Sequence, residues 1–253
     1  MRTYKTSEIA DIIGIHPNTV RLYEEWKLIP KPERKANGYR VYTDVHLEQM
    51  RFARIALKGE VMQNGIRKRA VNIIRTSAAG CYEAAIEMTR EYIEKIAEEK
   101  NRAEEAIEIV SNMLAESDRA EEPLQLTRKQ TADYLKLTID TLRNWEMNGL
   151  LTIKRKDNGY RVYNRNDILR LKIISSLRCA NYSLTAILRM LNDLSASSRF
   201  DIKSSINIPK ETEYIISVCD RLLTSLENLE QDAKQMLRQL EYMKSKFKQN
   251  PPL

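Results

Sequence analysis

The chain has 253 residues and a formal net charge of +7. Its three cysteines, Cys81, Cys179 and Cys219, are isolated and odd in number, which argues against a disulfide framework or a zinc ribbon and fits a reducing cytoplasm. No run of about 18 apolar residues occurs, and the first residues already look like folded sequence, so neither a membrane span nor a signal peptide is predicted.

The positive charge is concentrated in two segments. Residues 1–80 and 124–194 each carry +7, whereas residues 81–123 carry −8 and the remainder carries +1. A basic excess of this kind is typical of modules that neutralise phosphates. A solvated basic face without a partner is the alternative, but the acidic connector shows that the charges are segregated rather than scattered.

The hexapeptide NGYRVY occurs twice, at 37–42 and at 158–163. A matching helical pattern lies some fifteen residues upstream of each copy, NTVRLYE at 18–24 and DTLRNWE at 140–146. The repeat is about 120 residues long, which is too long for the unit of a solenoid. The sequence therefore predicts two copies of a whole small domain.

The first copy opens with two short helices. We expect Thr6 to cap the first helix, Gly14-Ile15-His16 to form a turn, and Pro17 to begin a second helix that runs to about Glu25. Two short helices joined by a tight turn containing glycine predict a helix-turn-helix.

The second copy repeats these signals. Thr127 and Gln130 are predicted to form a capping box, and Thr138 is predicted to cap the second helix. The turn has Lys136 in place of glycine, so it must form without the residue that favours a left-handed backbone.

A basic hairpin follows each helix pair. Helical periodicity stops between Leu28 and Tyr42, where a basic run ends in Asn37-Gly38, and this pattern predicts two short strands joined at an Asn-Gly turn. A helix-turn-helix followed by such a hairpin is a winged helix. Two further helices are predicted after each wing, starting near Asp44 and near Asn164.

Each repeat is then followed by a long helix with apolar residues at alternating spacings of four and three. The heptads run from Tyr82 to Leu114 and from Ile215 to Phe247, each about 50 Å long at about 1.5 Å per residue. Their equal length predicts that they pair, and the short polar link between Leu114 and Leu124 favours an antiparallel pair with Tyr82 opposite Phe247. Packing of each helix on its own domain or on a second chain is the alternative.

The predicted fold is therefore mainly α, with two winged helix-turn-helix domains and two long helices that form an antiparallel coiled coil. Its parts are the first winged helix (1–80), the first long helix (81–118), the second winged helix (119–194), a Ser-rich loop (195–208) and the second long helix (209–248).

These features resemble the MerR family of bacterial transcription regulators, twice over. The specific signal is the combination of Arg-x-aromatic-Glu on the second helix with the NGYRxY wing. Ordinary members look like one repeat plus one helix and act as homodimers, so this chain resembles both halves of such a dimer fused. The resemblance implies a single-chain pseudo-dimer that binds double-stranded DNA at an asymmetric promoter site, with RNA polymerase as a candidate partner and the cytoplasm, at the nucleoid, as its location.

The second helix of each copy is expected to enter the major groove, where Asn18 can read adenine and Thr19 a methyl group or phosphate. Asp140 in the second copy can accept from cytosine or simply favour the helix N-terminus, and Thr141 stands where Thr19 does. The full predicted DNA-binding set adds, by resemblance, backbone-contacting residues of the helices and wings: Arg21, Tyr23, Arg34, Lys35, Tyr39, Arg40, Arg143, Trp145, Lys154, Arg155, Lys156, Tyr160 and Arg161. Tyr42 and Tyr163 are equally compatible with the core.

No catalytic constellation is predicted, because neither of the two histidines lies near a paired carboxylate or cysteine in the sequence. No cofactor or metal site is predicted either, since Cys81 and Cys219 would lie at opposite ends of the paired helices. Three alternatives stay open. The protein can be an architectural or chromosome-segregation DNA binder, one repeat can be a protein-interaction module, and the long helices can pair between two chains of a homodimer.

Overall fold

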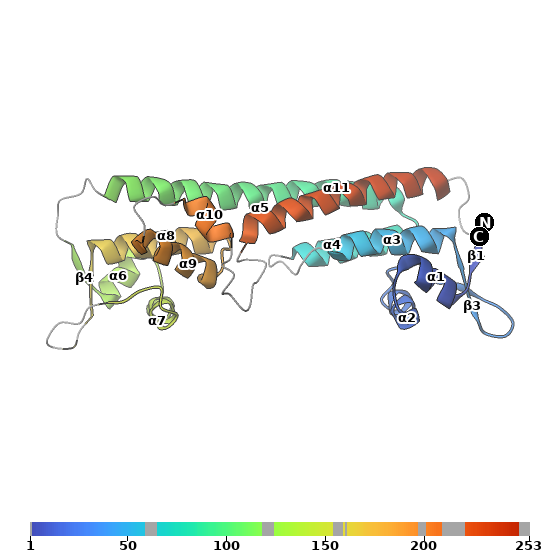
Figure 1. The fold of residues 1–253 in the computed structure, drawn as a ribbon, viewed down its shortest axis with the longest axis horizontal. Helices are drawn as coiled ribbons and strands as arrows, with labels where there is room; N and C mark the ends of the chain where they lie inside the picture. The colour runs from blue at the N-terminus through green and yellow to red at the C-terminus, as the bar shows by residue number, and fades with distance from the viewer. Residues whose placement is uncertain are drawn as a thin grey trace. The chain divides into compact units, whose positions relative to one another are not determined.

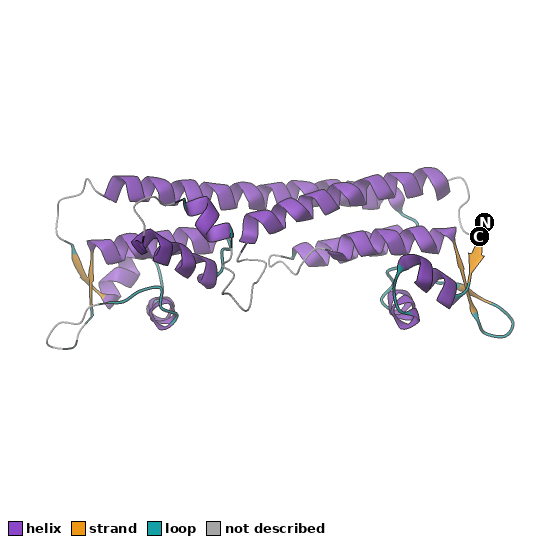
Figure 2. Ribbon diagram, in the orientation of Figure 1, coloured by secondary structure: helices purple, strands orange, loops and turns teal. Residues whose placement is uncertain are grey.

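The computed structural model describes residues 2–58, 65–117, 124–153, 159, 161–196, 201–208 and 221–247. The chain is mainly helical (Figures 1 and 2) and divides into two compact units. Unit 1 comprises Met1–Glu98 and Leu226–Leu253, and unit 2 comprises Glu99–Ser225. None of the described helices combines the length and the apolarity that a bilayer crossing requires.

Unit 1 begins with the predicted winged helix. Helices α1 (Thr6–Ile13) and α2 (Pro17–Glu25) are joined by Gly14, whose φ of 71° provides the left-handed turn. Strands β1 (Thr3–Tyr4), β2 (Glu33–Arg34) and β3 (Arg40–Thr43) form an antiparallel sheet in the order β1-β3-β2. The helix-turn-helix and the wing are thus present as predicted.

Two local details of unit 1 differ from the prediction. The N-cap of α1 is Lys5 rather than Thr6, and the backbone N–H of Lys5 donates to the Glu8 carboxylate at 2.7 Å. The wing loop is longer than an Asn-Gly turn, since Arg34 pairs with Arg40 and the intervening residues close it through Lys35 N–H donating to the Tyr39 carbonyl at 2.9 Å.

The rest of unit 1 packs helices onto this module. Helices α3 (Asp44–Lys58) and α4 (Ile66–Ala78) follow the wing, and the first half of α5 (Tyr82–Ser117) lies with α11 (Leu222–Phe247). Glu83, near the start of α5, pairs with Lys244, near the end of α11, at 3.5 Å, whereas Tyr92 lies near Asp232. The two helices therefore run antiparallel within unit 1.

The buried stripe of α5 differs in part from the predicted heptads. Tyr82, Ile86, Thr89, Ile96, Ala103 and Val110 are buried as expected. Ile93, Lys100, Ile107 and Leu114 are also predicted for the seam but are only half-buried. Four residues outside the predicted heptad positions are buried in addition: Ala85, Tyr92, Glu99 and Ala106. In α11 the described heptad positions Leu222, Leu226, Leu229, Ala233, Met236, Leu240, Met243 and Phe247 are all buried, while Ile215 and Cys219 lie outside the described residues.

Unit 2 repeats the winged helix. Its helices α6 (Arg128–Leu135) and α7 (Ile139–Met147) are joined at Lys136, whose φ of 54° is left-handed like that of Gly14 in unit 1. The predicted Thr127–Gln130 capping box is present, with the Thr127 N–H donating to the Gln130 side chain at 2.9 Å. Strands β4 (Gln125–Thr127) and β5 (Val162–Asn164) pair antiparallel.

The helices after the second wing are α8 (Arg165–Cys179), α9 (Leu184–Ala196) and α10 (Ile202–Asn207). The prediction of a Ser-rich loop over 195–208 is wrong for α10. Its N-terminus is capped by the Asp201 carboxylate, which accepts from the Ser204 N–H at 3.1 Å, and Ile202 and Ile206 are buried. The Asn207 side chain also accepts from the Leu223 N–H at 3.1 Å, which fixes the end of the helix.

A buried histidine makes unit 1 sensitive to acid. His46 is 7% exposed, its Nδ1 accepts from the Thr43 N–H at 3.1 Å, and burial lowers its pKa to about 4. Because the folded pKa lies below the ordinary value of 6.5, the unfolded chain binds the proton more readily, and stability present above pH 6.5 is lost as the pH falls toward 4.

We therefore expect unit 1 to lose about 2 kcal/mol of stability between pH 7 and pH 5 on account of His46. His46→Gln keeps an acceptor for the Thr43 N–H but cannot titrate in this range, so it should remove that part of the pH dependence. Urea unfolding of both proteins at the two pH values measures the difference. Identical pH dependence in the two proteins would contradict the assignment.

Candidate nucleic-acid interface

The second helix of each unit presents its predicted readers to solvent. In α2, Pro17 occupies the first turn and the His16 ring accepts from the Asn18 N–H at 3.1 Å. Asn18 and Arg21 are exposed, and the Asn18 side-chain oxygen accepts from Arg21 at 3.1 Å. Thr19 is half-buried. The exposed edge of α2 thus carries an amide beside a guanidinium that forms no ion pair with any described residue.

The matching edge of α7 has a different charge. The Thr138 hydroxyl caps the helix by accepting from the Thr141 N–H at 3.0 Å, as predicted. Asp140 and Arg143 are both exposed and form an ion pair at 3.2 Å. The Asn18–Arg21 pair of unit 1 is therefore replaced in unit 2 by a pair whose charges cancel.

The aromatic residues of the motif lie in the core. Tyr23 is 7% exposed and Trp145 is 6% exposed, so only the edge of each ring can reach a ligand, and their DNA contact stays a prediction. Tyr42 and Tyr163, which were equally compatible with either role, are fully buried. Their rings pack the wing strand onto the helices behind it.

A glutamate on each second helix holds the wing arginine. In unit 1, Arg40 Nε pairs with Glu24 at 2.5 Å, and Arg34 reaches the other Glu24 oxygen at 3.8 Å. These glutamates belong to the Arg-x-aromatic-Glu motif, but the sequence prediction gave them no role. The motif is the sequence signal that could have indicated this role, because an ion pair with a partly buried carboxylate holds an arginine side chain in a defined geometry.

In unit 2 the corresponding glutamate has more partners. Glu146 accepts from Tyr163 at 2.6 Å and pairs with Arg128 at 2.7 Å and with Arg161 at 2.9 Å. Burial by itself raises the pKa of Glu146, but the hydrogen bonds from Tyr163 and Arg128 and the charges of Arg128 and Arg161 outweigh burial and lower it. The carboxylate therefore stays ionised and keeps Arg161 oriented.

The tip of the first wing projects into solvent. Tyr39 is 72% exposed, and the Asn37 side chain accepts from its N–H at 3.3 Å while Gly38 adopts a φ of 81°. Arg34 and Lys35 are also exposed. In the second wing, Arg161 is described, whereas Lys154, Arg155, Lys156 and Tyr160 lie outside the described residues.

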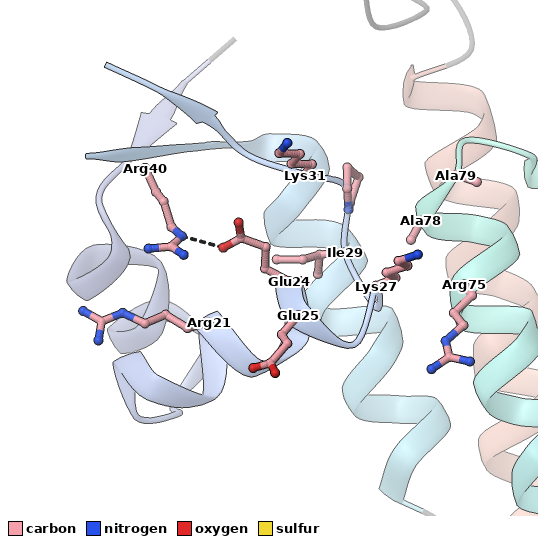
Figure 3. Close-up of a pocket in the computed structure, with 11 residues that line it drawn as sticks. Arg21, Glu24, Glu25, Lys27, Ile29, Lys31, Arg40, Arg75, Ala78 and Ala79 are labelled. Carbon is pink, nitrogen blue, oxygen red and sulfur yellow. Dashed lines mark hydrogen bonds and ion pairs between the residues drawn. The ribbon is translucent and has the colours of Figure 1, made fainter. Parts of the chain in front are cut away.

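An open groove of about 700 Å³ lies beside α2 in unit 1. Figure 3 shows Arg21 and Arg40 on one side of it and Lys27 and Arg75 on the other, with Lys31 near the wing. The Arg75 Nε donates to the Trp26 carbonyl at 3.2 Å, which attaches α4 to the end of α2. Lys27, Lys31 and Arg75 are not in the predicted DNA-binding set, because none of them belongs to the repeated motif.

The described part of the chain holds no group of three or more His, Cys, Asp or Glu side chains arranged to bind a metal ion. Cys81 and Cys179 are both exposed free thiols. The two histidines serve local backbone geometry, since each accepts from a backbone N–H at the start of a helix. The chemistry that this surface offers is therefore that of cations, amides and an exposed phenol.

Comparison with known proteins supports a regulatory family. The mercuric resistance operon regulatory protein of Bacillus cereus is 39% identical over 49 residues, which are 19% of this chain and 37% of that protein. The HTH-type transcriptional regulator CueR of Escherichia coli O157:H7 is 28% identical over 109 residues, covering 43% of this chain and 77% of CueR. The uncharacterized HTH-type transcriptional regulator YyaN of Bacillus subtilis is 29% identical over 125 residues, covering 45% of this chain and 90% of YyaN. No solved structure matches the chain significantly.

The family model described as MerR HTH family regulatory protein matches the chain twice, at residues 4–69 and 126–194. These two segments together make up more than half of the chain and coincide with the two winged helices of the structure. The chain belongs to the MerR family of helix-turn-helix regulators, with the family's segment present in two copies.

Proposed function

We propose that the protein is a sequence-specific DNA-binding transcription regulator that acts as a single-chain pseudo-dimer. The observation that carries this proposal is the double match to the MerR family within one chain. Each unit also combines one winged helix with part of α5, and the antiparallel run of α5 and α11 in unit 1 is what an intramolecular coiled coil requires. One chain would then supply what two chains supply in a homodimer.

In this proposal α2 and α7 enter successive major grooves and the wings hold the flanking phosphates. Wing arginines fixed by Glu24 and Glu146 set the position of each module on the backbone, while residues at the start of α2 and α7 read bases. Because Asn18 and Asp140 differ chemically, the two half-sites differ in sequence. Two modules held at a fixed spacing can also bend promoter DNA for RNA polymerase, and the nucleoid in the cytoplasm is the matching location.

The molar mass in solution tests the pseudo-dimer. Light scattering of the intact chain should give about its formula mass of 29.5 kDa when free, and one chain per duplex when bound to DNA recovered from a random pool by selection. A mass near twice this value would show that the long helices pair between chains. Binding at many scattered genomic sites, instead of a few promoters, would favour an architectural role.

An exchange of the two differing readers tests the unequal half-sites. Asp140→Asn removes a negative charge that lies close to the phosphates in the proposal, and so it should tighten binding to duplexes of any sequence by roughly threefold to tenfold. Asn18→Asp, the matched change in unit 1, should weaken binding by a similar factor. Filter binding at one salt concentration measures both variants. If Asp140→Asn instead weakens binding to the selected duplex alone, Asp140 is a base reader.

A further inference from the structure

The groove beside α2 gives unit 1 a set of cations that the described residues of unit 2 lack. We propose that Lys27, Lys31 and Arg75 form an additional DNA-backbone contact, which binds phosphates beyond those reached by the wing and belongs to the first repeat alone. This inference rests on the proposed function, since it takes DNA as the ligand. It adds three residues to the interface and predicts that the first repeat makes more phosphate contacts than the second.

The backbone of Lys27 is the first observation. Lys27 adopts a φ of 58°, a left-handed conformation that favours glycine, and the following Leu28 N–H donates to the Tyr23 carbonyl at 2.8 Å. The second repeat makes the same turn with Gly149, whose φ is 76°. Unit 1 therefore has a lysine at a backbone conformation that favours glycine, at the position where unit 2 has glycine.

The surroundings of the three cations are the second observation. All three side chains are exposed and line the groove, which is bordered in total by five cations and two carboxylates. Among the residues that the structure describes, Lys27, Lys31 and Arg75 take part in no ion pair, whereas Arg40 on the opposite side pairs with Glu24. Cations that face an open groove without a carboxylate partner bind phosphates by releasing counterions.

The contrast with unit 2 is the third observation. Gly149 stands at the position of Lys27, and the residues near the position of Lys31 are Thr152 and Ile153. The single cation of α9, Arg189, is buried and donates to the carbonyls of Ser205 at 2.7 Å and Ile206 at 3.1 Å. The described surface of unit 2 therefore offers no equivalent contact, and the longer footprint should lie on the half-site of unit 1.

The salt dependence of DNA binding tests this inference on the full-length chain. Lys27→Gly should reduce the slope of log K against log salt by about one, and the triple variant Lys27→Gly, Lys31→Gln, Arg75→Gln by about two to three. At a fixed salt concentration, Lys27→Gly should weaken binding roughly threefold to tenfold, equally on the selected duplex and on an unrelated one. Hydroxyl-radical footprinting of the triple variant should lose protection on one flank only.

Two controls accompany the measurement. Arg90→Gln removes one positive charge from α5 outside the groove and should leave the slope unchanged. Lys136→Gly makes the same backbone change at the left-handed turn of unit 2, so it shows the effect of glycine on thermal stability. Lys27→Gly should fold at least as well as the wild type, because glycine suits that turn. If the triple variant does not fold, the salt slope of Lys27→Gly alone shows whether the groove contacts phosphates.

The outcomes separate the two proposals. If the wild-type chain binds no duplex, the proposed function fails and the groove contact fails with it. If the wild type binds DNA but Lys27→Gly and the triple variant keep its affinity and its salt slope, the groove does not contact phosphates, and only this inference is overturned. A loss of slope in Arg90→Gln equal to that in Lys27→Gly would also overturn it, because the effect would then reflect net charge.

Discussion

Replacing Gln49 by methionine should lower the free energy of unfolding of unit 1 by about 3 kcal/mol, because polar groups are left unpaired in a buried site. The buried Gln49 amide donates to the carbonyls of Leu28 and Ile74, both at 3.0 Å, and accepts from the Ser77 hydroxyl at 2.8 Å. It thereby ties α3 to the chain leaving α2 and to α4. Methionine fills a similar volume but restores none of these bonds.

The two tryptophans allow unit 1 to be followed separately. Trp26 belongs to unit 1 and Trp145 to unit 2, so a Trp145→Phe background leaves Trp26 fluorescence as a reporter of urea unfolding in unit 1. Ser77→Ala should cost only about 1 kcal/mol, and the double variant should cost less than the sum of the single ones, because both remove the same bond. If each single variant lowers the free energy of unfolding by less than about 0.5 kcal/mol, and the two losses add in the double variant, the hydrogen-bond network contributes little to stability.

Replacing Arg40 and Arg161 together by glutamine should weaken DNA binding about a hundredfold and lower the salt slope by about two, since each wing loses a backbone contact. Each single replacement should cost roughly tenfold if both wings touch DNA. An effect from only one of them would indicate that the other repeat is a protein-interaction module. Fluorescence anisotropy with a labelled duplex at several salt concentrations measures both quantities.

Substituting the glutamate that pairs with a wing arginine distinguishes its role in orienting the arginine from its effect on the net charge. Glu24→Gln makes the protein more positive, so long-range electrostatics alone would tighten DNA binding. We expect roughly threefold to tenfold weaker binding instead, because Arg40 loses the ion pair at 2.5 Å that orients its guanidinium. Glu25→Gln, an exposed neighbour in the same groove with the same change of charge, is the matched control. Tighter binding by both variants would refute a positioning role for Glu24.

Features that repeat along the sequence could be predicted from it. The two helix-turn-helix motifs, the helices after the wings and the seam of α11 follow from caps, turns and periodicity, and the structure contains them. The capping box at Thr127 and the cap at Thr138 needed only local residue types. These features depend on neighbours in the chain, which is what a single sequence displays.

Features set by distant neighbours could not be predicted. Strands β1 and β4 are only two and three residues long, which is too short for a periodic signal in the sequence, and each pairs with a wing strand that is distant in the chain. Helix α10 lies in a Ser-rich segment that looks like a loop until Arg189 binds its last carbonyls. Lys27, Lys31 and Arg75 of the groove lie in the turn after α2, in the segment before β2 and in α4, and no sequence motif links these three positions.

The discontinuity of unit 1 has a consequence for how the protein is made. Unit 2 is continuous from Glu99 to Ser225, but unit 1 needs residues from Leu226 onward to cover α3 and α5, for example through Gln239 donating to the buried Glu48 at 3.0 Å. At about 5–20 residues per second, a ribosome reaches that segment roughly ten seconds after finishing Glu98. During translation, we therefore expect unit 2 to fold first, because unit 1 can complete its fold only after the C-terminal segment has been synthesised.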